Sequence, residues 1–93
     1  MVREHAERAV VLTKRFLEDL RDWIETDRKV ALRVLGLMDS VASEPFAGIG
    51  KPEPLRHELA GCWSRRITQE HRLVYRVTND RVEFLQARYH YDM

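Results

Sequence analysis

The sequence of 93 residues contains one cysteine, Cys62, which excludes an internal disulfide and a zinc site built from several cysteines. No stretch approaches the ~18 consecutive apolar residues of a membrane-spanning helix. The charged N-terminus lacks the apolar core of a signal peptide. Neither a phosphate-binding P-loop nor a dinucleotide-binding glycine pattern occurs. These absences predict a cytoplasmic protein that does not contact membranes and does not bind nucleotides through either motif.

Metal chemistry is not indicated either. Zinc sites need histidines, cysteines and acids at short spacing, and magnesium sites need clustered carboxylates. The sequence shows neither pattern around its four histidines, which are His5, His57, His71 and His90. We therefore expect no metal and no cofactor, so that any reaction would depend on acidic, basic and cationic side chains.

The composition is typical of a small globular domain, with 44% hydrophobic and 33% charged residues. The net charge of +1 is unevenly distributed, because residues 1–48 carry 8 Lys+Arg and 9 Asp+Glu whereas residues 49–93 carry 8 and 6. A length of 93 residues fits a single domain, 1–93, near the lower limit for a self-sufficient core. A homodimer or another partner would therefore add stability.

Hydrophobic periodicity in the first half predicts a hairpin of two helices. Thr13 is a suitable N-cap for the first helix, and Thr26 or Asp27 for the second, which should end before Pro45. Trp23 is interpreted as a packing residue rather than a platform for stacking bases. The expected core-facing residues are Phe16, Leu17, Leu20, Trp23 and Ile24 in the first helix and Val30, Ala31, Val34, Leu35, Met38 and Val41 in the second.

From residue 57 onward apolar and polar residues alternate, as in antiparallel strands with one buried face. The fold class is therefore α+β, with the helix hairpin packed on one face of a twisted, mainly antiparallel sheet, in the order strand, helix, helix and four strands. The expected strands are an edge strand at 9–13, a short strand RHEL at 56–59, and the segments CWSRRIT at 62–68, HRLVYRVT at 71–78 and RVEFLQARYHY at 81–91.

The alternation gathers arginines on one face of the sheet, among them Arg66 and Arg72. Arginines beside tyrosines and histidines supply forked donors for phosphate and flat groups for bases. The same pattern also fits an exposed sheet face with scattered charge, so both interpretations stay open. For His71 and Tyr75, which share a face with Leu73, we expect packing roles.

Residues 44–56, EPFAGIGKPEPLR, form a long irregular segment of the kind that often carries functional residues. Within it Pro52 and Pro54 flank Glu53 and restrict the backbone that aims its carboxylate. Metal-free RNA cleavage suits the available groups: a base takes the proton of the ribose 2′-OH, an acid protonates the leaving 5′-oxygen, and cations stabilise charge at phosphorus. We interpret Glu53 as the base, His90 as the acid, and Arg72, Arg66 and Lys51 as the cations.

Residues 45–91 closely resemble the YoeB (Txe) family of bacterial toxins, within the RelE/ParE group of toxin-antitoxin ribonucleases. The motifs GKPEPL, WSRRIT, EHRLVY and RYHY occur in the order and spacing of that family, and WIETD at 23–27 falls at its helix-hairpin turn. The resemblance extends over residues 9–91. It implies a RelE-like microbial ribonuclease fold and a toxin that cuts mRNA in the A site of the 70S ribosome without a metal. It also implies control by a cognate YefM-like antitoxin.

The resemblance also assigns roles to individual residues. It makes Glu53 the general base, His90 the general acid, Arg72 the phosphate-stabilising arginine and Tyr91 the near-terminal tyrosine of the catalytic site. By the same resemblance, positions around the RNA and the ribosome correspond to Lys51, His57, Arg65 and Arg66, and Arg56 is expected to join them through its charge.

Three features depart from the family pattern. The chain has an N-terminal extension, residues 1–8, and a C-terminal tail, Asp92 and Met93, and it has Cys62 where an aromatic residue is common. The carboxylate of Asp92 beside the histidine would either favour the protonated imidazole or compete with substrate phosphate. The alternatives are a translation inhibitor that occupies the A site without cutting and a gyrase-directed relative of the same superfamily. The set of Glu53, Arg72, His90 and Tyr91 favours cleavage over both.

Overall fold

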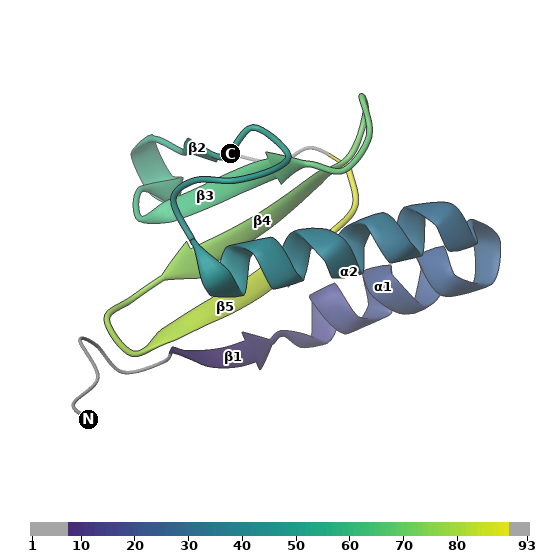
Figure 1. Ribbon diagram of the computed structural model, residues 1–93, viewed down its shortest axis with the longest axis horizontal. Helices are drawn as coiled ribbons and strands as arrows, with labels where there is room; N and C mark the ends of the chain where they lie inside the picture. The colour runs from purple at the N-terminus through teal and green to yellow at the C-terminus, as the bar shows by residue number, and fades with distance from the viewer. Residues whose placement is uncertain (1–7, 90–93) are drawn as a thin grey trace.

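The computed structural model describes residues 8–89, apart from the side chain of Glu58. The described strands form one sheet in the order β1-β5-β4-β3-β2, with β1 parallel to β5 and the other neighbours antiparallel. The helix pair lies on one side of this sheet (Figure 1), which confirms the α+β class. The elements are β1 (Ala9–Leu12), α1 (Lys14–Thr26), α2 (Arg28–Ser43), β2 (Glu53–Pro54), the 3-10 helix η1 (His57–Leu59), β3 (Cys62–Arg66), β4 (Arg72–Val77) and β5 (Arg81–Gln86).

Two side-chain caps set the helix hairpin. The hydroxyl of Thr13 accepts a hydrogen bond from the backbone N–H of Phe16 at 3.1 Å, and the carboxylate of Asp27 accepts from Val30 at 3.3 Å. Both bonds satisfy backbone N–H groups that have no partner inside the helix. Thr13 is confirmed as the first N-cap, and Asp27 rather than Thr26 caps α2.

The main core lies between the helices and the sheet. The helices contribute the predicted buried residues to this core, namely Phe16 and Trp23 from α1 and Val34 and Val41 from α2. The predicted apolar faces need correction at their margins, because Leu17, Ile24 and Leu35 are exposed whereas Asp19 and Leu37 are buried. The sheet contributes Ile67, Leu73, Tyr75, Val82, Phe84 and Ala87 to the same cluster.

Two strand predictions were wrong. RHEL is not a strand, because residues 57–59 form η1, and the short strand is Glu53–Pro54, which pairs with Ser64 and Trp63. The last strand ends at Gln86 rather than continuing to residue 91, and residues 90 and 91 lie outside the described residues.

A second, smaller hydrophobic cluster packs against the sheet next to β2. Leu55 packs there against Cys62 and Val74, with Leu59 and Leu85 at its margin. Because Leu55 is the residue after β2, its burial ties the segment that carries Glu53 to the sheet. Within residues 8–89, no helix combines the length and the apolar character needed to cross a bilayer.

Candidate active site

An ion pair between Glu53 and Arg72 forms the centre of the candidate site. Antiparallel pairing places Glu53 of β2 opposite Ser64 of β3, and Arg72 lies at the start of β4, the next strand. One guanidinium nitrogen of Arg72 donates to a carboxylate oxygen of Glu53 at 3.1 Å and to the hydroxyl of Ser64 at 3.2 Å. The side chain of Arg72 is 16% exposed and that of Glu53 is 56% exposed. A fixed cation therefore lies beside an acid that solvent or substrate can reach.

The other residues predicted to bind RNA or the ribosome, apart from Arg65, lie on exposed parts of the chain. Lys51, Arg56, His57 and Arg66 are all exposed. Arg66 is the cross-strand partner of Arg72, so two arginines lie side by side at this end of the sheet. Such an arrangement can bind more than one phosphate of an RNA strand.

Arg65 does not belong to this surface, and the predicted contact with RNA or the ribosome is corrected. Its side chain is fully buried on the helix side of the sheet. Arginine has five N–H donors, and each finds an acceptor at 2.6 to 3.1 Å: Tyr75 Oη, Ser40 Oγ, Ile49 O, Glu44 O and Ala47 O. A guanidinium with all its donors occupied inside the protein is a structural group.

The acceptors of Arg65 show what that group holds. Three of them are carbonyl oxygens of residues 44–49, the irregular segment that leads to Lys51 and Glu53. Tyr75 adds a fourth contact, since its hydroxyl donates to the Pro45 carbonyl at 2.8 Å. Burial raises the pKa of this phenol, so it stays a donor at neutral pH. Arg65 and Tyr75 thus fix the loop from inside, and the packing role predicted for Tyr75 is confirmed.

The chain after β5 approaches Arg72 from the other side. The backbone N–H of Arg72 donates to the Tyr89 carbonyl at 3.0 Å, and the Tyr89 N–H donates to His71 Nδ1 at 2.6 Å. His71 also packs edge-on against Trp23 at 4.9 Å, which confirms its predicted packing role and that of Trp23. His90 and Tyr91 follow Tyr89 directly in the sequence but lie outside the described residues.

Backbone conformation is unusual around the site. Lys51, His57 and Tyr89 have φ angles of 53°, 60° and 60°. These are the residues with positive φ, other than glycine, in the described chain, and each is a predicted site residue or directly precedes one. Side chains with a Cβ pay a steric penalty in this region, so surrounding contacts must hold the conformation.

Sequence reasoning missed three polar contacts that organise the site. Ser64 supports Arg72, and no local pattern indicates this because the contact depends on the pairing of β3 with β4. Asp19 and Trp23 of α1 hold the chain after β5: Asp19 accepts from the Ala87 N–H at 2.9 Å, and Trp23 Nε1 donates to the Ala87 carbonyl at 2.7 Å. The signal for Asp19 was an acid at a core-facing helical position, three residues after Phe16.

Other titratable groups of the sheet lie apart from the Glu53–Arg72 pair. Hydrogen bonds from Arg81 and Arg76 hold the pKa of the Glu83 carboxyl below its usual range. Burial raises the pKa of the Cys62 thiol, which disfavours the nucleophilic thiolate. Across residues 8–89, no group of three or more histidine, cysteine, aspartate and glutamate side chains is arranged to hold a metal ion.

Comparison with known sequences connects this geometry to a family. A family model described as the YoeB-like toxin of bacterial type II toxin-antitoxin systems matches residues 12–91. Toxin RelK of Mycobacterium tuberculosis is 57% identical over 74 residues, which cover 80% of this chain and 87% of the relative. Toxin YoeB of Streptomyces coelicolor is 50% identical over 82 residues, which cover 88% of this chain and 98% of the relative.

Solved structures agree with the sequence match. A YoeB/ParE toxin from Agrobacterium tumefaciens superposes with a TM-score of 0.85 at 45% identity, covering 89% of this chain and 99% of that one. The YoeB dimer from Staphylococcus aureus gives 0.82 at 34% identity, covering 92% and 100%. The YoeB-YefM complex from the same organism gives 0.80 at 33% identity, also covering 92% and 100%. The chain therefore belongs to the YoeB family of toxins from bacterial type II toxin-antitoxin systems.

Proposed function

We propose that this toxin is an endoribonuclease, an mRNA interferase that enters the A site of the ribosome and cuts the bound mRNA. The observation that carries the proposal is the Glu53–Arg72 pair, in which an exposed carboxylate lies 3.1 Å from a guanidinium that Ser64 also holds. General acid-base cleavage of RNA needs a base and a cation close to the same phosphate. The chain leading to His90 adjoins Arg72 through the Tyr89 carbonyl.

The proposed reaction proceeds without a metal. Glu53 takes the proton of the ribose 2′-OH, and the resulting oxygen attacks the adjacent phosphorus. His90 protonates the 5′-oxygen as the P–O bond breaks, which leaves a 2′,3′-cyclic phosphate and a 5′-hydroxyl. Arg72 stabilises the extra negative charge at phosphorus, and Tyr91 completes the site.

The ion pair itself suggests how the base becomes available. Glu53 and Arg72 satisfy each other in the absence of RNA. A substrate phosphate competes for the guanidinium of Arg72, because phosphate and carboxylate both accept its forked donors. Binding of the phosphate would draw Arg72 away from Glu53 and leave the carboxylate next to the 2′-OH. Lys51, Arg56, His57 and Arg66 would hold the RNA and ribosomal backbone around this centre.

The test is primer extension on mRNA bound to 70S ribosomes, with the same mRNA lacking ribosomes as the control. We expect new 5′ ends within the A-site codon only when ribosomes are present. Arrest of translation without new 5′ ends would instead identify a non-cleaving inhibitor. If the toxin causes neither cleavage nor arrest of translation but inhibits DNA supercoiling by gyrase, it is a gyrase-directed toxin.

We further propose that a YefM-like antitoxin binds and silences this toxin in the cytoplasm, and that the toxin can form a homodimer. The solved YoeB-YefM complex and the solved YoeB dimer support these assemblies. To test antitoxin binding, the toxin is co-expressed with the acidic protein that a neighbouring gene would encode. The purified complex is then assayed on ribosomes. A complex that cleaves at the rate of the free toxin would contradict silencing. Sedimentation of the free toxin tests for the homodimer.

A further inference from the structure

Tyr89 is held in a conformation that its own side chain disfavours. Its φ of 60° lies in the left-handed region, which is sterically unfavourable for a residue with a Cβ. Both backbone polar groups of Tyr89 are bound: the N–H donates to His71 Nδ1 at 2.6 Å, and the carbonyl accepts from Arg72 at 3.0 Å. The ring of Tyr89 also lies 5.3 Å from that of His71. These contacts offset the cost of the strained backbone.

His71 is itself a rigid support. Its N–H donates to Thr68 Oγ1 at 3.1 Å and its carbonyl accepts from Ile67 at 2.9 Å, so a tight turn fixes its backbone. Its ring packs edge-on against Trp23, and its side chain is only 12% exposed. The acceptor that holds Tyr89 therefore has little freedom to move.

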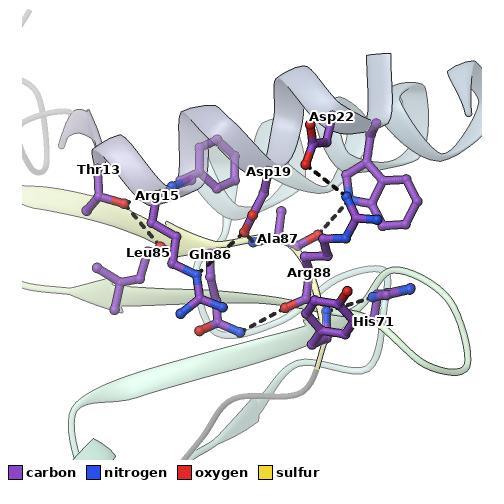
Figure 2. Close-up of polar contacts among 12 residues, drawn as sticks. Thr13, Arg15, Asp19, Asp22, His71, Leu85, Gln86, Ala87 and Arg88 are labelled. Atoms are coloured by element: carbon purple, nitrogen blue, oxygen red, sulfur yellow. Dashed lines mark hydrogen bonds and ion pairs between the residues drawn. The ribbon is translucent and has the colours of Figure 1, made fainter. Parts of the chain in front are cut away.

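Helix α1 secures the residues just before Tyr89. Figure 2 shows Asp19 reaching the N–H of Ala87 and Asp22 paired with Arg88. The Trp23 indole N–H also donates to the Ala87 carbonyl. These contacts fix the path of the chain as far as Arg88. His71 then holds Tyr89, the residue that directly precedes His90.

We propose that His71 is a positioning residue for the catalytic C-terminus. Its Nδ1 fixes the backbone of Tyr89 and thereby sets where the chain delivers His90 relative to Arg72 and Glu53. This rests on the proposed function, in which His90 is the general acid. His71 touches no reacting atom in this scheme, and it acts only through Tyr89.

The contact depends on the protonation of the ring. An imidazole nitrogen accepts a hydrogen bond only without a proton, so Nδ1 can hold Tyr89 only when His71 is neutral with its proton on Nε2. Among the described residues, Glu70 lies 3.8 Å from Nε2. Arg88 pairs with Asp22 and lies over the rings of Trp23 and Tyr89, both of which contact the His71 ring. Protonation of Nδ1 would set a donor against the Tyr89 N–H and break the bond.

A matched pair of variants tests the role. His71→Asn places an amide oxygen near the position of Nδ1. His71→Leu introduces a side chain of similar shape to asparagine that has no hydrogen-bond acceptor. Both lose the ring contact with Trp23, so their difference isolates the hydrogen bond. The measurements are amide hydrogen exchange at Tyr89 by NMR, single-turnover mRNA cleavage at saturating ribosomes, and affinity for ribosomes.

We expect His71→Asn to keep Tyr89 protected and to cleave within about threefold of the parent. His71→Leu should lose the protection and cleave ~10²-fold more slowly, with unchanged ribosome affinity, since a displacement of ~1 Å can cost this factor.

Equal cleavage by the two variants, or a protected Tyr89 amide in His71→Leu, would overturn the positioning role. If His71→Leu does not fold, NMR detection of the hydrogen bond between the Tyr89 amide and His71 Nδ1 in the parent decides instead, and its absence would overturn the role. If the parent does not cleave mRNA at all, the proposed function fails. The exchange data then still decide whether His71 holds Tyr89.

Discussion

Arg65 and Arg66 are consecutive residues of β3 whose side chains lie on opposite faces of the sheet. Arg65 is fully buried and donates hydrogen bonds to Tyr75, Ser40 and three loop carbonyls. Arg66 is exposed beside Arg72, and within residues 8–89 its hydrogen bonds are those of its backbone, with Gly50 and Arg33. Two identical side chains thus have different tasks, one inside the fold and one at the candidate RNA surface.

This contrast predicts that the same substitution lowers stability strongly at residue 65 and hardly at all at residue 66. Arg65→Met should lower the free energy of unfolding by about 3 kcal/mol or more, because several buried oxygens lose their donor. Arg66→Met should change it by no more than about 0.5 kcal/mol, as is usual for exposed positions. Urea unfolding monitored by circular dichroism measures both. Similar stabilities for the two variants would contradict the structural role of Arg65.

The sequence predicted much of the fold because its signals were local. Thr13 and Asp27 are recognisable caps, and the alternation of apolar and polar residues indicates strands with one buried face. The acceptors of Arg65 come from residues 44–49, well separated in sequence, so nothing near Arg65 shows that its charge is buried.

The wrong strand at residues 56–59 has a similar cause. Alternation in RHEL resembles a short strand, but burial of Leu55 against Cys62 and Val74 shifts the pairing to Glu53–Pro54. The Glu53–Arg72 pair likewise depends on the pairing of three strands, so the sequence supplies both residues and the register brings them together. The placement of His90 and Tyr91 stays a prediction.

Substitutions at the ion pair should separate charge from geometry. Glu53→Gln keeps the size and the acceptor but cannot take a proton, so cleavage should fall by ~10²-fold or more. Stability should change by less than about 1 kcal/mol, because Glu53 is largely exposed. Single-turnover cleavage on ribosomes gives the rate. Cleavage by Glu53→Gln at the parental rate would remove Glu53 as the base.

Arg72 offers a second comparison at the same pair. Arg72→Ala should slow cleavage by about 10²–10³-fold, since loss of one preorganised donor costs about 3–4 kcal/mol in the transition state. Arg72→Lys keeps the charge but loses the planar guanidinium, which binds Glu53 and Ser64 through one nitrogen and offers forked donors to a phosphate. We expect it to recover only part of the rate. Full recovery by lysine would show that charge alone suffices.

Ribosome binding should depend steeply on salt through the exposed cations. If Lys51, Arg56 and Arg66 contact RNA phosphates, affinity should fall between about 50 and 200 mM salt, and each neutral variant should reduce the slope. Arg81→Gln provides a control, because this arginine is occupied by Glu83. Filter binding at several salt concentrations measures the slopes. An affinity that does not change with salt would exclude these contacts as the main anchor.

Glu83 should make stability depend on pH in a defined direction. Arg81 and Arg76 lower the pKa of its carboxyl in the folded state, so its stabilisation is present above the unfolded pKa. It is lost as the pH falls through the lowered folded pKa. Glu83→Gln should therefore be less stable than the parent at neutral pH, and the difference should vanish in acid. Urea unfolding across this pH range tests it, and a difference independent of pH would contradict the ion-pair origin.

Two substitutions at Lys51 can distinguish the effect of its strained backbone from the effect of its side-chain charge. Lys51 has a φ of 53°, which costs any residue with a Cβ about 1–2 kcal/mol, whereas glycine adopts it freely. Lys51→Ala and Lys51→Gly both remove the ammonium group, so both should weaken ribosome binding and cleave equally slowly. Glycine also loses more entropy on folding, at a cost of about 0.5–1 kcal/mol. The free energy of unfolding of Lys51→Gly should therefore equal that of Lys51→Ala or exceed it by up to about 1.5 kcal/mol. Slower cleavage by Lys51→Gly than by Lys51→Ala would instead show that a rigid backbone before Glu53 contributes to the rate.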